Sequence, residues 1–211
     1  MYPRYEFHQQ EQAIDELSAS LKQLALRARD LGIALTVDAE EADRLDMSLQ
    51  IFKRVFTDPD LADWEGLGLA VQAYQKRAYA IIEWLVSLSK LQGKRIQCRL
   101  VKGAYWDTEI KHAQIHGWSS YPVFTRKPST DISYLACAKL LIDNRDCFYP
   151  KFATHNAYTV AAILTLLQKS GDSSGVEFQN LQGMGKALHA QILSLGIPCR
   201  CLLYTSPSPR D

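Results

Sequence analysis

Residues 95–107, near the middle of the sequence, combine a strand pattern with side chains that could bind a ligand. Ile96, Cys98 and Leu100 alternate with more polar residues, and this two-residue period indicates a strand with one apolar face. Arg99 then lies on the opposite face, toward whatever the sheet encloses. The segment therefore predicts a strand that places a guanidinium inside the fold.

The residues after this predicted strand suit a large, flat, anionic cofactor. Lys102 and Gly103 follow its carboxyl end, and Tyr105, Trp106 and Asp107 come next. A fixed guanidinium beside a glycine and stacked aromatic rings is an arrangement that such a cofactor needs. A strand whose arginine pairs with a buried acid would show the same pattern, so the residues alone leave both interpretations open.

Two single polar residues fall where other predicted strands end. Asp38 suits a helix cap or an ion pair, and Arg99 is its obvious partner. Gln72 could hydrogen-bond the polar edge of a ligand, and it could equally be an amide satisfied within the core. Both positions are candidates for a site at the ends of the strands.

Two polar triplets add to these candidates. One triplet offers two cations and a hydroxyl group that suit phosphates, although a solvated loop would have the same composition. The other precedes an apolar helix, whose first N–H groups would favour an anion. A lone histidine there would more often be structural, but three adjacent polar groups favour binding. The triplets are Thr125, Arg126 and Lys127, and Thr154, His155 and Asn156.

The composition excludes several classes of protein. The chain has 211 residues, of which 47% are hydrophobic and 22% charged, and this indicates one soluble globular domain. A net charge of +1 leaves no basic excess for nucleic acid. We find neither an apolar run of about 18 residues nor a signal peptide. Five cysteines without a Cys-x-x-Cys pair fit a reducing, cytoplasmic compartment.

Two kinds of catalytic site lack their sequence patterns. His112 and His116 are four residues apart on a predicted helix, but no glutamate lies between them. No serine nucleophile elbow occurs either. We therefore predict no metal site.

Predicted strands and helices alternate along the chain. The strands begin near residues 33, 67, 96, 122, 149, 176 and 198, a spacing of roughly 22 to 34 residues that is typical of βα units in a parallel sheet. The absence of Gly-x-Gly-x-x-Gly counts against an open dinucleotide-binding sheet. Polar inward residues at the carboxyl ends of the strands favour a (β/α)8 TIM-type barrel. Only six units are complete, so we predict an incomplete barrel.

Six sequence blocks resemble the proline dehydrogenase domain of the bifunctional proline utilization A flavoenzymes. They keep the order and spacing of that family over residues 1 to about 200. The blocks are VDAEEADRL (37–45), QAYQKR (72–77), RLVKGAYWD (99–107), YLACAK (134–139), FATHN (152–156) and FQNLQGMG (178–185).

The resemblance implies a distorted (β/α)8 barrel that holds FAD and oxidises L-proline to Δ1-pyrroline-5-carboxylate by hydride transfer to the flavin. It implies a quinone as electron acceptor, a cytoplasmic enzyme that can associate peripherally with the inner membrane, and an aldehyde dehydrogenase domain as a candidate neighbour in the parent chain. The implied catalytic residues are Asp38, Arg99, Tyr105 and Leu181. The implied cofactor residues are Gln72, Arg99, Val101, Lys102, Gly103, Ala104, Trp106, Thr125, Arg126, Lys127, Thr154, His155 and Asn156.

Some features depart from the family pattern. The first barrel strand, with an active-site lysine, would lie before Met1, and Leu202 stands where the family has a substrate tyrosine. Residues 201–211 replace an adjacent pair of arginines with a Ser/Pro tail that we predict to be non-native. We therefore expect residues 1–200 to be a partial proline dehydrogenase barrel, and the chain alone to be poorly active.

Two other functions remain as alternatives. A non-catalytic flavin-binding or scaffold barrel would keep the cofactor residues without substrate chemistry. A barrel hydrolase or aldolase without flavin would need a base and nucleophile pair, which is not evident in the sequence.

Overall fold

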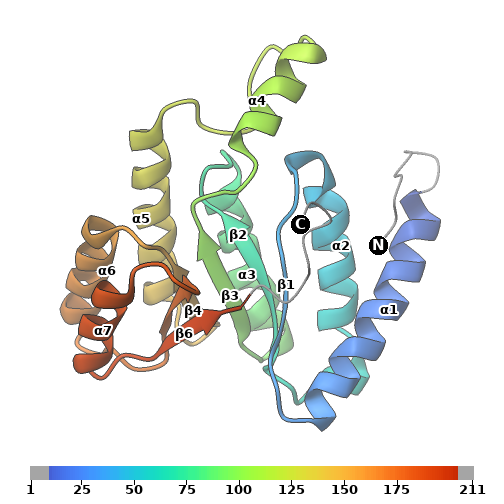
Figure 1. Ribbon diagram of the computed structural model, residues 1–211. Coiled ribbons are helices and arrows are strands. Elements are labelled where there is room, and N and C mark those ends of the chain that lie inside the picture. Colours follow the sequence, from blue (N-terminus) through green and yellow to red (C-terminus); the bar gives the residue numbers. More distant parts are fainter. Residues whose placement is uncertain (1–9, 204–211) are drawn as a thin grey trace.

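The structure is a computed structural model that describes residues 10–203 (Figure 1). Six strands alternate with seven α-helices and two short 3-10 helices within that range. The α-helices are α1 (Gln10–Asp30), α2 (Leu45–Phe56), α3 (Ala78–Gln92), α4 (Trp106–Ile115), α5 (Lys127–Asp143), α6 (Ala157–Ser170) and α7 (Lys186–Ser194). The strands are β1 (Leu35–Val37), β2 (Leu67–Gln72), β3 (Ile96–Val101), β4 (Phe148–Ala153), β5 (Glu177–Leu181) and β6 (Cys199–Leu202). The 3-10 helices are η2 (Ala42–Arg44) and η3 (Pro59–Leu61).

All six strands form one parallel sheet, and their order in the sheet is their order in the chain. The sheet curls, with helices covering its outer side (Figure 1). Parallel neighbours need a long crossover connection, which the helices supply here. The arrangement is an α/β half-barrel, as expected for an incomplete TIM-type barrel.

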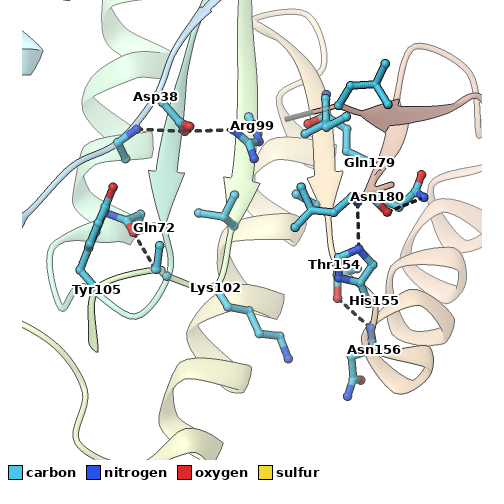
Figure 2. Close-up of a pocket in the computed structure, with 18 of the residues that line it drawn as sticks. Asp38, Gln72, Arg99, Lys102, Tyr105, Thr154, His155, Asn156, Gln179 and Asn180 are labelled. Atoms are coloured by element: carbon cyan, nitrogen blue, oxygen red, sulfur yellow. Dashed lines mark hydrogen bonds and ion pairs between the residues drawn. The ribbon is translucent and has the colours of Figure 1, made fainter. Parts of the chain in front are cut away.

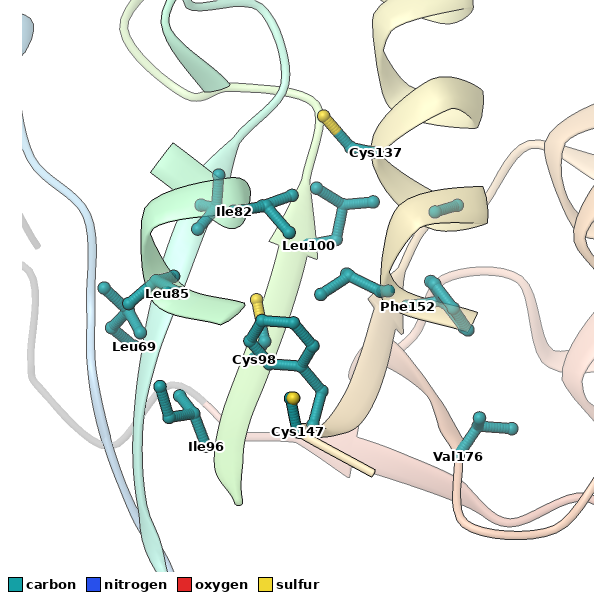
Figure 3. Packing of buried hydrophobic residues seen from close by; sticks show 14 of the residues in the cluster. Leu69, Ile82, Leu85, Ile96, Cys98, Leu100, Cys137, Cys147, Phe152 and Val176 are labelled. Carbon is teal, nitrogen blue, oxygen red and sulfur yellow. The ribbon is translucent and has the colours of Figure 1, made fainter. Parts of the chain in front are cut away.

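The main core lies between the outer face of the sheet and the helices. Ile96, Cys98 and Leu100 are fully buried there, and they pack near Ile82 and Leu85 of α3 (Figure 3). The intervening residues of β3 are only partly buried, because they face the inside of the curl. The two-residue period of this strand therefore separates a core face from a site face.

One predicted strand is wrong. Near residue 122 the chain forms only an isolated antiparallel bridge between Val123 and Gln75. The segment hydrogen-bonds to the loop after β2, through Phe124 N to Tyr74 O at 2.8 Å, and does not enter the sheet. Lys127, at the end of this segment, begins α5. Short apolar segments can satisfy their backbone groups in such a crossover as well as in a sheet.

The other predicted strands are present, and each begins within two residues of its predicted position. The strand expected from residue 33 is only Leu35–Val37, whereas Leu67–Gln72 matches its prediction. The predicted tail at 201–211 begins within β6, and residues 204–211 lie outside the described part of the chain. No helix among the described residues is long and apolar enough to cross a membrane.

Candidate functional site

A cavity of about 910 Å³ lies at the carboxyl ends of the strands, inside the curl of the sheet (Figure 2). This is where parallel barrels place their active sites, and the volume is near the upper end for ligand pockets. It is lined by Asp38, Ala39, Gln72, Arg99, Val101, Lys102, Gly103, Ala104, Tyr105, Lys127, Ala153, Thr154, His155, Asn156, Gln179, Asn180, Leu181, Leu202 and Leu203.

Arg99 and Asp38 form the ion pair that the sequence predicts. Nη1 of Arg99 lies 2.9 Å from Oδ1 of Asp38. The arginine side chain is 21% exposed and the aspartate side chain 73%, so the acid lies at the rim of the cavity. Nε of Arg99 is buried and has no hydrogen-bond partner among the described residues. The guanidinium is therefore held at one nitrogen and has a donor left for a ligand.

Gln72 is satisfied within the protein, although it lines the cavity. Its Nε2 donates to the carbonyl oxygen of Glu40 at 2.8 Å, and its Oε1 accepts from N of Ala104 at 3.0 Å. The side chain is buried, so these two bonds meet the needs of a buried amide. Gln72 thus ties the end of β2 to the loops that follow β1 and β3.

The loop after β3 passes unusually close to an aromatic ring. Gly103 has φ +148, and a Cβ atom at this position would lie 2.3 Å from the ring of Tyr74. Both the backbone angle and the space therefore require glycine. Ala104 and Tyr105 of the same loop line the cavity, as does Val101 at the end of β3.

Two lysines and one carboxylate form a cationic cluster at one side of the cavity. Nζ of Lys102 contacts Oδ1 of Asp131, and Nζ of Lys127 lies 2.7 Å from Oδ2 of the same residue. Hydrogen bonds from Lys102 and Lys127 lower the pKa of Asp131. One acid between two cations leaves a net positive charge, which suits an anionic group such as a phosphate. Asp131 is missing from the sequence predictions, although its i,i+4 spacing from Lys127 is a signal for the pair.

The triplet 154–156 shapes the turn between β4 and α6. Asn156 caps α6, because its Oδ1 accepts from N of Thr159 at 2.9 Å. Nε2 of His155 accepts from N of Leu181 at 3.0 Å, so the ring proton lies on the other nitrogen. Oγ1 of Thr154 accepts from N of Asn156 at 3.2 Å. These bonds join the ends of β4 and β5 at the cavity.

All predicted site residues except three line this cavity. Trp106 is exposed, and its Nε1 donates to the carbonyl oxygen of Phe124 at 2.9 Å. Thr125 and Arg126 are exposed at the start of α5. Gln179 and Asn180 line the cavity but were not predicted. Gln179 could have been found, because it is two residues from Leu181 and shares its face of the strand.

The described residues contain no group of three or more His, Cys, Asp or Glu side chains that could hold a metal ion. The site instead offers a guanidinium, two ammonium groups, amides and apolar surface. Such a set suits an elongated ligand with an anionic part and a flat polar part.

Comparisons with known proteins agree with the resemblance seen in the sequence. The family model described as proline dehydrogenase matches residues 4–208. The bifunctional protein PutA of Salmonella typhimurium is 48% identical over 206 residues, and that of Escherichia coli is 46% identical over 206 residues. Each alignment covers 95% of this chain and 16% of the relative, so the chain spans about one sixth of their length.

Solved structures are similar as well. Proline utilization A of Bradyrhizobium japonicum superposes with a TM-score of 0.90 at 48% identity, over 95% of this chain and 20% of that one. The protein of Bdellovibrio bacteriovorus, solved after inactivation by N-propargylglycine, gives 0.89 at 29% identity, over 92% of this chain and 20% of that one. The structural comparison and the sequence comparison therefore identify similar proteins of the same kind.

Proposed function

The chain belongs to the proline dehydrogenase family, and on this premise we propose that its residues form the flavin-binding side of an active site. That site oxidises L-proline to Δ1-pyrroline-5-carboxylate with FAD as the electron acceptor. FAD would occupy the cavity at the carboxyl ends of the strands, and proline would lie beside its ring.

The observation that carries this proposal is the free donor of Arg99. Nε of Arg99 is buried at a cavity of about 910 Å³ without a partner among the described residues. A buried donor without an acceptor costs about 1–3 kcal/mol, so a ligand that supplies an acceptor is favoured there. A flavin ring has ring nitrogens and carbonyl oxygens along one edge. The residues present therefore fit this cofactor.

Each part of the cavity suits a part of FAD. Lys102 and Lys127 would attract the pyrophosphate, because their cluster with Asp131 keeps a net positive charge. The start of α6, next to Asn156, would face the adenosine half. We propose as cofactor residues Gln72, Arg99, Val101, Lys102, Gly103, Ala104, Trp106, Thr125, Arg126, Lys127, Thr154, His155 and Asn156.

In this reaction the protein would position the reactants and supply fixed charges around them. When bound, FAD would supply the acceptor for the hydride that leaves the ring carbon next to the proline nitrogen, while that nitrogen loses a proton and the carbon–nitrogen bond becomes double. Arg99 would place a fixed positive charge where negative charge develops, and Asp38 would keep that guanidinium oriented. Tyr105 and Leu181 would pack against the substrate and exclude water from it. These four residues are the proposed catalytic set.

We further propose that electrons pass from this site to a quinone, in a cytoplasmic protein that meets the inner membrane peripherally. The PutA relatives carry the word bifunctional in their names. An aldehyde dehydrogenase domain beside the barrel would consume the product of the proposed reaction. Membrane vesicles with and without quinone, compared for the rate of flavin reoxidation, would test the electron acceptor.

The main test follows FAD in the purified chain. After incubation with FAD and gel filtration, we expect one FAD per chain, and its visible absorbance should bleach when proline is added without oxygen. Single-turnover reduction is measured because we expect steady-state activity of the chain alone to be low. Arg99→Met should slow the bleaching by about 100-fold, as removal of one preorganised donor does in other sites.

Arg95→Met is the matched control. Arg95 precedes the same strand but pairs with Glu65, 2.9 Å from Nε to Oε2, far from the cavity. It should leave the bleaching rate unchanged. A folded chain that retains no FAD, or retained FAD that stays oxidised with proline, would contradict the proposal.

One observation favours the second candidate, a flavin-binding module without catalysis. Arg99, Lys102 and Lys127 are the Lys and Arg side chains of the described cavity, and each already contacts a carboxylate. Arg99 is the one guanidinium among them, so if its remaining donors serve the flavin, no bidentate partner is left for the proline carboxylate. Retained FAD that never bleaches would support this candidate.

A further inference from the structure

Gln179 of β5 has one half of its amide unused. The residue is 3% exposed and lines the cavity. Its Nε2 donates to Oε1 of Glu177 at 2.6 Å. Its Oε1 is buried and has no hydrogen-bond partner among the described residues. An unpaired buried carbonyl oxygen in a ligand cavity requires an explanation, because such groups are rare and costly.

The orientation of the Gln179 amide is fixed by the carboxylate of Glu177. Arg200 holds the carboxylate of Glu177 with two hydrogen bonds, Nε to Oε1 at 2.9 Å and Nη2 to Oε2 at 3.0 Å. Burial opposes ionisation of Glu177, but the hydrogen bonds from Arg200 and Gln179 outweigh it and lower its pKa. An ionised carboxylate only accepts hydrogen bonds, so the NH2 group of Gln179 must face it. The oxygen of the amide must therefore face away from Glu177.

The strand register shows which side chains flank Gln179 on the inner face of the sheet. Gln179 pairs with Ala153 of β4, and Gln72 pairs with Val101 of β3. The printed pairing of β3 with β4 ends at Leu100 and Phe152, one position before Val101 and Ala153. The inner face thus presents two amides, Gln72 and Gln179 (labelled in Figure 2), with two smaller side chains between them, and all four line the cavity. A flat ring would fit over the small pair, with an amide at either side.

We propose that Oε1 of Gln179 accepts a hydrogen bond from an N–H group of the ligand in this cavity, and that Glu177, held by Arg200, is the positioning residue that keeps this oxygen facing the ligand. The inference rests on the proposed function, which supplies two N–H donors. One is the imide N–H of the flavin ring, and the other is the ring nitrogen of proline. Gln72 differs, because each end of its amide already makes one hydrogen bond within the protein.

Two substitutions test the two parts of the proposal. Gln179→Met keeps the length of the side chain but removes the acceptor oxygen. It should weaken binding of the ligand that carries the N–H donor by about 5- to 10-fold, the usual effect of one neutral hydrogen bond. Glu177→Gln leaves Gln179 in place but adds an NH2 group that can donate to its oxygen. The amide would then turn, and binding should weaken to a similar degree.

The double variant separates positioning from a general loss of structure. If Glu177 acts through Gln179, the combined change should weaken binding no more than Gln179→Met alone, because the two effects are not additive. Gln97→Met is the matched control. Gln97 also faces inward, but it donates to the carbonyl oxygen of Glu65 at 3.0 Å and does not line the cavity. It should leave binding unchanged.

Two measurements distinguish the two donors. The dissociation constant of FAD, from quenching of its fluorescence, should rise in both variants if the flavin imide is the donor. The proline concentration that half-saturates the rate of bleaching should rise, with unchanged FAD affinity, if the proline nitrogen is the donor. If folded variants bind FAD and saturate with proline as the unsubstituted chain does, the assignment of Gln179 is overturned but the proposed function is not. An unsubstituted chain that binds no FAD would overturn the proposed function with it.

Discussion

Single residues at the cavity differ in how far their surroundings fix them. Gly103 is fixed by both backbone angle and space, since φ is +148 and the ring of Tyr74 occupies the place of a side chain. Tyr74 in turn is buried, and its backbone N–H donates to the carbonyl oxygen of Lys102 at 2.7 Å. The loop therefore cannot move away from the ring without losing this bond.

Gly103→Ala should lower the free energy of unfolding by about 3 kcal/mol, because it adds both backbone strain and overpacking. Gly93→Ala is the control, since Gly93 has φ +65 but nothing within 4 Å of the added atom. It should cost about 1 kcal/mol from backbone strain alone. Urea unfolding, extrapolated to water, measures both values. Equal losses in the two variants would show that the Tyr74 ring yields to the new methyl group.

Strand periodicity predicted Asp38, Gln72 and Arg99 at the inner ends of strands, and the resemblance to a known family implied most of the other cavity residues. The pairing of Asp38 with Arg99 was expected and is present. Neither Gln179 nor Asp131 was expected. The role of Gln179 depends on which end of its amide is occupied, and that depends on Glu177. A partner two residues away on the same strand leaves no mark in a hydrophobic pattern.

Individual elements meet the cavity through their ends. The cap of α6 is an example, because Asn156 lies after β4 and lines the cavity as well. Its Oδ1 accepts from both N and Oγ1 of Thr159, at 2.9 and 3.1 Å. The same side chain thus ends the strand connection and begins the helix.

Asn156→Ala should destabilise the protein by about 1 kcal/mol, the usual cost of losing an N-cap side chain. Asn156→Asp should restore stability, because a carboxylate also accepts from the backbone and favours the positive end of the helix. Thermal unfolding followed by circular dichroism at helix wavelengths tests the pair. An alanine variant as stable as the original would mean that the helix start is held by packing alone.

Two strands begin at the residues predicted for them. β2 begins at Leu67 and is buried on both sides, whereas β3 begins at Ile96 and is fully buried on one side only. β1 is shorter than expected because only Leu35 to Val37 pair with β2. The false strand near residue 122 is short and begins with the apolar residues Val123 and Phe124, but its partners are in the loop after β2. Local pattern gives the strand tendency, whereas the choice of partner is a tertiary effect.

The molecule as a whole keeps several carboxylates in ion pairs. Hydrogen bonds to lysine or arginine lower the pKa values of Asp46, Asp58, Glu65 and Asp131. Burial lowers the pKa of His189. In each case the unfolded state binds protons more readily than the folded state. Stability therefore rises with pH wherever these groups titrate.

We expect the urea midpoint to be highest near pH 7 and to fall on acidification. The loss should begin below the ordinary histidine pKa of about 6.5, as His189 is protonated in the unfolded chain. It should steepen below about pH 4.3, where unfolded carboxylates are protonated, and should continue as the pH falls through the lower folded values. His189→Asn should remove the first part only. A midpoint that stays constant from pH 7 to pH 4 would contradict the expectation.

The order of the strands has a consequence for the time at which the cavity first exists. Each strand pairs with the one before it in the chain, so during synthesis at the ribosome a new βα unit can dock onto units already made. The cavity, however, takes Asp38 from the beginning of this sheet and Leu202 from its last strand. A growing chain can therefore have a nearly complete core while its ligand site is still open. A ligand that contacts all of these strands can stabilise the fold only after β6 has emerged, so it would act late, by holding together strands that have already paired.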